Sequence, residues 1–226
     1  GGWVSADPLT TQAVDHRLLC FARAGGADTV MPGTDATGFG YYSYAERGAL
    51  ISTGEPLRIV TLAPSVTETL CAVGGEDLII GTDLYSDYPQ SIVDGREDGS
   101  IAVTGGYTDP NYEYIVRLDP DIVFCDGGAG EHLSMADKLR KSGIDCVVLY
   151  NCTAVDTLYR NMWIAAAAIG MSENARSEIN SIRGTIDEVS GLAGMTNQRI
   201  FSALSADPSP WTTGSLTYLS EIGALC

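Results

Sequence analysis

The sequence predicts an α/β protein whose open, mostly parallel sheet is covered by helices on both faces. Two observations predict this fold. From Arg58 onward, short apolar segments alternate with segments of helical spacing. Several apolar segments, such as 122–124 and 147–149, are continuously hydrophobic, as strands buried on both faces of a sheet require.

The N-terminal lobe accounts for most of these elements. The expected strands are 58–62, 78–82, 101–104, 121–125 and 146–150, and the expected helices are 65–73, 111–118 and 131–142. Ser65 and Glu68 match the S-x-x-E capping box and are expected to begin the first helix. Ligands of such sheets bind beyond the carboxyl ends of the strands, so the connecting loops there are the first place to seek a site.

The rest of the chain divides around this lobe. Residues 1–57 are rich in Gly, Thr and Tyr and are expected to form an irregular extension that ends in a strand. The lobe itself covers 58–152. A helical connector follows at 153–196, with one helix at 155–169 and a long one from Ser172 to about 192. Residues 197–226 then open a second α/β lobe, with a strand at 199–204 and a helix at 215–225.

Composition excludes several classes of function. The formal net charge of −16 would repel nucleic acid and anionic lipid headgroups. No run of eighteen apolar residues is present, so no membrane-spanning helix is expected, and no signal-peptide pattern precedes the domain. The six cysteines form no CxxC pair, and both buried free thiols and disulfides remain open. Two histidines, His16 and His132, argue against a His-rich zinc site.

A family resemblance covers the predicted lobe and extends beyond it. Residues 58–89 read RIVTLAPSVTETLCAVGGEDLIIGTDLYSDYP, and 103–124 read VTGGYTDPNYEYIVRLDPDIVF. Together with 139–149 and 200–214, these motifs resemble, in the same order, the cobalamin and iron-siderophore family of periplasmic binding proteins. The resemblance implies two lobes joined by a long helix. It also implies a non-enzymatic, extracytoplasmic component of an ABC importer, which captures cobalamin, haem or a ferric siderophore and delivers it to a membrane permease.

The same resemblance implies which side chains contact the ligand. Tyr85 and Tyr107 follow strand ends in the first lobe, and Trp211 aligns with an aromatic residue that the second lobe presents to the ligand. A flat ring suits a corrinoid or chelate face, although a Trp packed on its own lobe is the alternative. Asp126 follows a strand and is either a ligand contact or a turn residue. Ser65 is either a ligand contact or only a helix cap.

Two acidic residues are candidates for docking to the permease. Glu113 lies in the first turn of a predicted helix, where the family uses a glutamate to dock permease arginines. The helix dipole alone also favours an acidic residue there. In the second lobe the docking position falls on Ala224, and Glu221, about one turn earlier, is the nearest acidic residue.

The second lobe is expected to be incomplete, because family members continue well beyond the position of Cys226. One strand and one helix do not close a sheet. The chain is then a fragment, or the N-terminal extension or a second copy completes the lobe. Exposed apolar surface on a truncated lobe would favour self-association.

Two other functions share the same scaffold. One is a metallocofactor-handling enzyme, against which no His/Cys cluster, nucleophile elbow or phosphate-binding loop appears. The other is a ligand sensor that acts without a transporter. No separate cofactor is expected beyond the bound chelate. The loops 84–90, 104–112 and 126–131 contain no Lys or Arg, which favours a corrinoid or a neutral or cationic chelate over an anionic catecholate.

Overall fold

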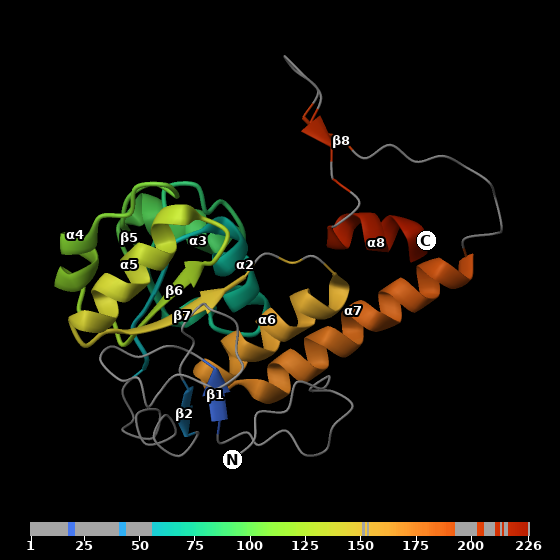
Figure 1. The fold of residues 1–226 in the computed structure, drawn as a ribbon, viewed down its shortest axis with the longest axis horizontal. Coiled ribbons are helices and arrows are strands. Elements are labelled where there is room, and N and C mark those ends of the chain that lie inside the picture. The colour runs from blue at the N-terminus through green and yellow to red at the C-terminus, as the bar shows by residue number, and fades with distance from the viewer. Residues whose placement is uncertain are drawn as a thin grey trace.

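The computed structural model contains one parallel sheet at the centre of an α/β lobe (Figure 1). It describes residues 56–150, 152, 154–192, 214 and 217–225, together with the strands β1 (Leu18–Cys20), β2 (Tyr41–Ser43), β8 (Ala203–Ser205) and β9 (Trp211–Thr212). The predicted strand at the end of the extension and most of 193–216 lie outside the described residues.

The central sheet has five strands in the order β5-β4-β3-β6-β7, all parallel. Their bounds are β3 (Ile59–Thr61), β4 (Ile79–Thr82), β5 (Ala102–Val103), β6 (Ile122–Asp126) and β7 (Asp145–Leu149). The predicted α/β class is therefore confirmed. The chain places β4 and then β5 on one side of β3, and β6 and then β7 on the other. The strand order thus reverses between β3 and β6, where α/β sheets open a crevice for ligands.

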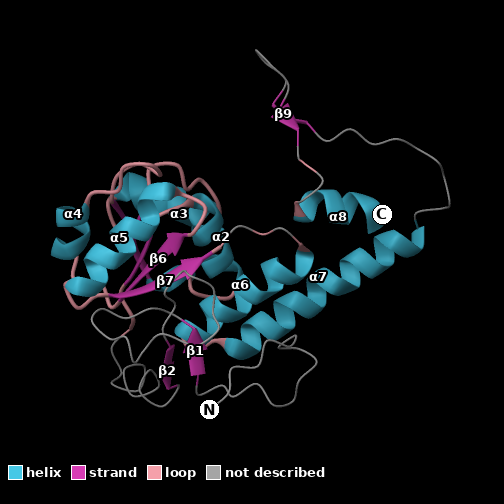
Figure 2. Ribbon diagram, in the orientation of Figure 1, coloured by secondary structure: helices cyan, strands magenta, loops and turns pink. Residues whose placement is uncertain are grey.

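Helices cover both faces of this sheet (Figure 2). The lobe contains α2 (Pro64–Ala72), a 3-10 turn (Glu76–Leu78), α3 (Gln90–Asp98), α4 (Tyr112–Arg117) and α5 (Gly130–Lys141). Alternate residues of each strand enter different cores: Ile122 and Phe124 pack toward α2, whereas Val123 and Cys125 pack toward α5. This period-two alternation explains why the strands are continuously apolar.

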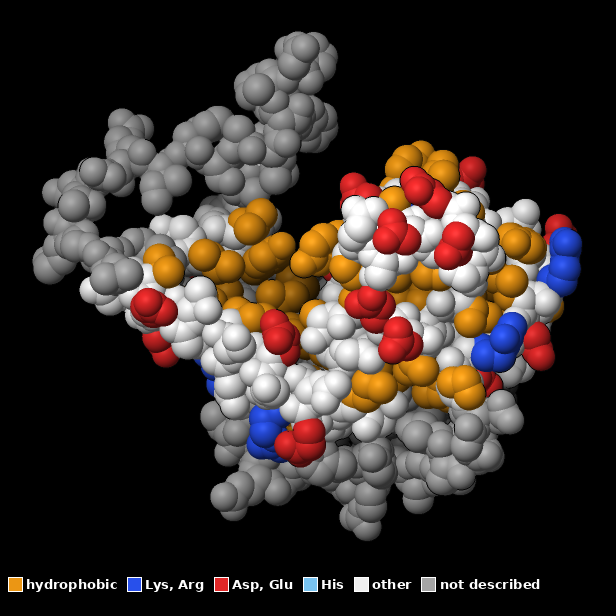
Figure 3. Space-filling view, turned by 180° about the vertical axis from the view of Figure 1, so that it is seen from behind, with side chains coloured by type: hydrophobic (Ala, Val, Ile, Leu, Met, Phe, Trp, Pro, Cys, Tyr) orange, Lys and Arg blue, Asp and Glu red, His pale blue; other side chains and the backbone are white. Residues whose placement is uncertain are grey.

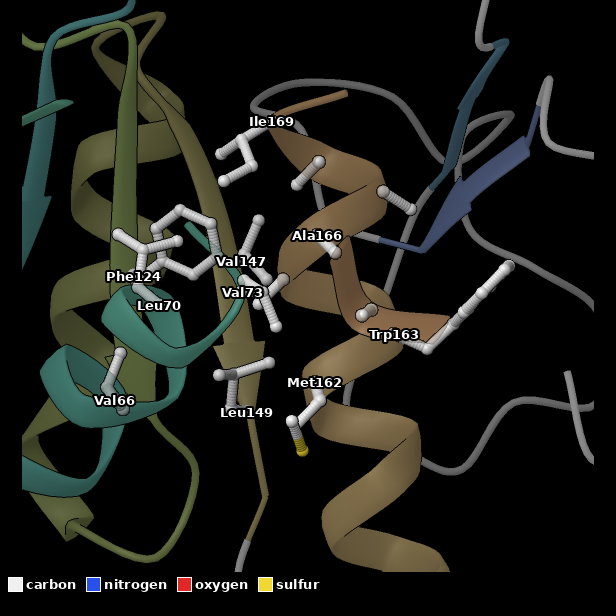
Figure 4. Packing of buried hydrophobic residues seen from close by; sticks show 14 of the residues in the cluster. Val66, Leu70, Val73, Phe124, Val147, Leu149, Met162, Trp163, Ala166 and Ile169 are labelled. Atoms are coloured by element: carbon white, nitrogen blue, oxygen red, sulfur yellow. The ribbon is translucent and has the colours of Figure 1, made fainter. Parts of the chain in front are cut away.

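The core beneath α2 also receives the first long helix of the connector. Residues from α6 (Val155–Ala168), including Met162, Ala166 and the adjacent Ile169, face the side chains of Leu70 and Val147 (Figure 4). The helix α7 (Ser172–Leu192) lies beside α6, and α8 (Tyr218–Leu225) contacts both (Figure 1). At 1.5 Å per residue α7 is about 30 Å long. The long helix expected from Ser172 to about 192 is therefore present.

Two local predictions are wrong. The first helix begins with Pro64 at its first position after Ala63, without a side-chain cap, so Ser65 and Glu68 form no capping box. Proline suits that position because its φ is already helical and its missing N–H needs no partner there. The helix α3 was not expected, since only Ile92 and Gly95 in it are buried and its sequence therefore shows no apolar stripe.

Candidate ligand-binding site

Four of the predicted site residues lie at one edge of the sheet. Ser65 is the second residue of α2, shortly after β3; Tyr85 follows β4, Tyr107 follows β5, and Asp126 is the last residue of β6. Parallel strands place all their carboxyl ends at the same edge, so segments far apart in sequence meet there. Ser65 and Asp126 flank the point between β3 and β6 where the strand order reverses.

The Asp126 carboxylate is the polar centre of this edge. Its Oδ2 atom accepts hydrogen bonds from Ser65 Oγ at 3.5 Å and from the Tyr107 hydroxyl at 3.4 Å. Its Oδ1 accepts the Gly128 N–H at 2.7 Å, which makes Asp126 a turn residue as well. Both hydroxyl contacts are long and therefore weak, so a ligand can replace them at small cost. The structure thus brings Ser65, Tyr107 and Asp126 together.

The Tyr107 hydroxyl stays protonated as a hydrogen-bond donor. Partial burial, followed by the negative charge of Asp126 and the hydrogen bond to it, raises the pKa of Tyr107 above its ordinary value. The group therefore offers a proton to a ligand oxygen or to Asp126, and it adds no negative charge to the site.

Large apolar side chains project from the neighbouring loop. Leu84, Tyr85 and Tyr88 are 55%, 60% and 66% exposed. The Tyr85 ring lies beside Gly106, whose added Cβ would be 3.7 Å from Tyr85 Cε2, and so it borders the residue next to Tyr107. Exposed aromatic groups beside convergent polar groups are the usual composition of a small-molecule site.

Buried polar groups hold this aromatic loop in place. The Asp83 carboxylate accepts the Tyr85 N–H at 2.7 Å and the Ser86 hydroxyl. Ser86 in turn bonds Thr67 Oγ1 at 2.9 Å, within a fully buried cluster that also includes Thr61 and Thr82. Because unpaired buried hydroxyls are costly, this cluster favours a single loop conformation. From the outer side, Arg96 donates to the carbonyl of Leu84.

His132, which was not predicted as a site residue, lies directly beneath the polar centre. Its side chain is completely buried. Its Nδ1 accepts the Asp126 N–H at 3.0 Å, and its Nε2 is 2.7 Å from the Tyr107 carbonyl oxygen. Its position in the sequence was one signal, since His132 lies in the first turn of α5, just after the Gly-rich segment that follows Asp126. A single histidine without a metal-binding partner nevertheless gave no reason to select it.

Two predicted residues, Glu113 and Glu221, lie apart from this centre. Glu113 is exposed in the first turn of α4, behind Asn111, whose side chain accepts the Tyr114 N–H. Glu221 lies on α8, and its Oε2 accepts the Val155 N–H at 2.7 Å, at the start of α6. Trp211 begins β9, and its side chain lies outside the described residues.

The molecule is hollowed between the lobe and the helical segment, and hydrophobic side chains gather in this hollow (Figure 3).

Within the described residues, no group of three His, Cys, Asp or Glu side chains is placed to hold a metal ion. In the same part of the chain, no helix is long and apolar enough to cross a membrane. Cys71, Cys125, Cys146 and Cys152 are free thiols, which agrees with the free-thiol alternative rather than with disulfides among these four.

Comparison with known proteins assigns the chain to a family. Residues 59–214 match the family model described as periplasmic binding protein, and the chain belongs to that family. One relative is the uncharacterized ABC transporter substrate-binding lipoprotein YvrC of Bacillus subtilis, with 24% identity over 173 residues. The aligned residues make up 74% of this chain and 53% of YvrC. The chain therefore spans about half the length of this curated relative.

Two solved structures share the fold. The periplasmic haem-binding protein HutB of Vibrio cholerae superposes with a TM-score of 0.63 at 20% identity, over 75% of this chain and 63% of that one. The periplasmic vitamin B12-binding protein BtuF of Vibrio cholerae gives a TM-score of 0.59 at 24% identity, with the same coverage of both chains. At these identities the likeness shows the fold, which agrees with the family assignment.

Proposed function

We propose that this chain is the solute-binding component of an ABC importer and captures a metal chelate of the corrinoid, haem or ferric-siderophore kind. One observation supports this most: the hydrogen-bonded cluster of Ser65, Tyr107 and Asp126 lies at the switch point of the sheet, beside the exposed rings of Tyr85 and Tyr88. Such a site offers flat apolar surface and a few directed polar groups, and the proposal requires no catalytic residue.

In this proposal the chelate lies between the lobe and the segment that contains Trp211. Tyr85 and Trp211 contact its faces, while Tyr107, Asp126 and Ser65 bind its polar edge. The location is extracytoplasmic, as family membership and the lipoprotein relative suggest. Loops that contain no Lys or Arg favour a neutral or cationic chelate, because Asp126 would repel an anionic one.

Calorimetric titration with cyanocobalamin, haemin and ferric siderophores of different charge tests this proposal. We expect one of them to bind, and we expect Tyr85→Ala and Asp126→Asn each to weaken it by about tenfold, as lost stacking or hydrogen bonding of about 1–2 kcal/mol implies. The matched control is Asp137→Asn, which changes an exposed carboxylate on α5 and should leave affinity unchanged. Failure of every chelate to bind would overturn the proposal.

Docking to the permease is a separate part of the proposal. Glu113 is exposed, so an arginine of the permease can reach it without rearrangement of the lobe. We expect Glu113→Ala to weaken association with the permease in detergent or nanodiscs while chelate affinity stays the same. Glu188→Ala, on the exposed side of α7, is the control. Loss of chelate binding in Glu113→Ala would refute the assigned role.

A further inference from the structure

His132 connects the backbones of two predicted ligand contacts that belong to different parts of the sheet. Tyr107 follows β5 and Asp126 ends β6, and these strands are separated in the sheet by β4 and β3. The imidazole bridges this distance, with Nδ1 3.0 Å from the Asp126 nitrogen and Nε2 2.7 Å from the Tyr107 oxygen. The Tyr107 and His132 rings also meet edge to face, with centroids 5.3 Å apart.

The two partners determine the protonation state of the ring. A backbone N–H can only donate, so Nδ1 must carry no hydrogen where it meets Asp126. A carbonyl can only accept, so Nε2 must carry the hydrogen that points to Tyr107. The observed geometry therefore requires the neutral imidazole with its proton on Nε2. The doubly protonated ring would direct one N–H at another.

The surroundings of the ring favour the same neutral state near pH 7. Burial lowers the pKa of His132 below its ordinary value, against the smaller opposing effects of the Tyr107 carbonyl and of the carboxylates of Asp126 and Asp83. Those two carboxylates and the Tyr107 hydroxyl are the titratable groups that face it from other elements, and Glu131 adjoins it on its own helix.

We propose that His132 is a positioning residue that holds Tyr107 and Asp126 in their binding geometry only while it is neutral, so that the site loses affinity in mildly acidic solution. This inference rests on the proposed function. When Nδ1 takes up a proton from solvent, it no longer accepts the Asp126 N–H, which is left without its buried partner. The new cation attracts the Asp126 carboxylate away from Ser65 and Tyr107, and the three side chains lose their binding geometry.

The chain offers a direct test, because it contains only two histidines and histidine is the side chain whose ordinary pKa lies in this range. Affinity for cyanocobalamin and for ferrioxamine B is measured between about pH 7.5 and pH 5, where neither chelate titrates. We expect affinity of the wild type to fall about tenfold over this range, as loss of one buried hydrogen bond implies. His16→Gln should show the same fall.

Two variants distinguish a positioning role of His132 in the site from a contribution of His132 to the stability of the fold alone. His132→Gln can still accept from Asp126 and donate to Tyr107, so it should keep affinity within about threefold at pH 7.5 and lose the pH dependence. His132→Phe preserves volume without hydrogen bonds, so it should bind weakly at every pH. Circular dichroism establishes that each variant is folded. An unchanged pH dependence in His132→Gln would overturn the inference.

A ligand-free measurement distinguishes failure of this inference from failure of the proposed function. The backbone amide resonances of Asp126 and Tyr107 should shift with pH in the wild type and in His16→Gln but not in His132→Gln. If they shift in this way and no chelate binds, positioning by His132 stands and the chelate proposal fails. If they do not shift, the inference is wrong whichever chelate binds.

Discussion

Removal of the Glu221 carboxylate should loosen α8 from the connector. Glu221 Oε2 accepts the Val155 N–H at 2.7 Å, although 66 residues separate the two. Val155 is the first residue of α6, and the preceding Ala154 has no side-chain acceptor for the free N–H groups of that helix end. A carboxylate from another helix therefore takes the place that Ser, Thr, Asp or Asn usually occupies.

The magnitude follows from two contributions. A hydrogen bond to a charged group contributes about 1.5–3 kcal/mol, and a negative charge at a helix N-terminus about 0.3–1 kcal/mol. These add to about 1.8–4 kcal/mol, and because Glu221 is exposed, screening by solvent reduces the effect to about 1–2 kcal/mol. Glu221→Ala should therefore let α8 open about tenfold more often, and Glu221→Gln, which keeps an acceptor, should have roughly half the effect in free energy.

Native-state hydrogen exchange measures this directly. Amides of α8 should exchange about tenfold faster in Glu221→Ala, whereas the core strands should be unaffected. Glu188→Ala, an exposed change on α7, is the control and should leave exchange unchanged. Unchanged exchange of α8 in Glu221→Ala would refute the reasoning. Weaker permease association in Glu221→Ala without faster exchange would instead favour docking as the role of this residue.

Three further predictions concern stability. Phe124→Ala empties a fully buried position between the sheet and α2, so urea denaturation should show a loss of about 3–5 kcal/mol, and a loss below about 1 kcal/mol would contradict the packing. Gly127→Ala would place a Cβ inside the van der Waals contact distance of Tyr150 Cδ1, so the ring must move; we expect a cost of about 1–3 kcal/mol, and an unchanged melting temperature would be inconsistent with this contact. Burial depresses the pKa of His132, so the neutral ring makes its full contribution to the free energy of unfolding above about pH 6.5. That contribution should be lost as pH drops from there through the lowered pKa of His132. Thermal denaturation at several pH values should show this loss in the wild type but not in His132→Gln.

Much of the lobe could be predicted because its signals are local. Residues 122–124 and 147–149 are apolar without interruption, and the structure buries them on both faces of the sheet. The order of strands and helices along the chain then determines which loops reach the carboxyl edge. Ser65, Tyr85, Tyr107 and Asp126 lie at that edge for this reason alone, and their roles as ligand contacts remain predictions.

Helix starts were harder to predict where two local signals compete. The Ser65 and Glu68 spacing matches a capping box, yet Pro64 suits the first helical position and moves Ser65 inside the helix. There its hydroxyl is free to face Asp126. The helix α3 escaped prediction because Gly95 takes the place of a core side chain: an added Cβ would be 2.7 Å from Ile101 Cδ1. Close packing against a glycine leaves no hydrophobic periodicity to detect.

By itself, the sequence determined the α/β class, the succession of strands and helices, and the loops that form the candidate site. These follow from hydrophobic periodicity and chain order, which act over a few residues. Only the tertiary structure decided that His132 joins Tyr107 to Asp126 and that Glu221 caps α6. Both depend on contacts between elements distant in sequence, where the position of one hydrogen-bond partner is set by the packing of the whole lobe rather than by its neighbours in the chain.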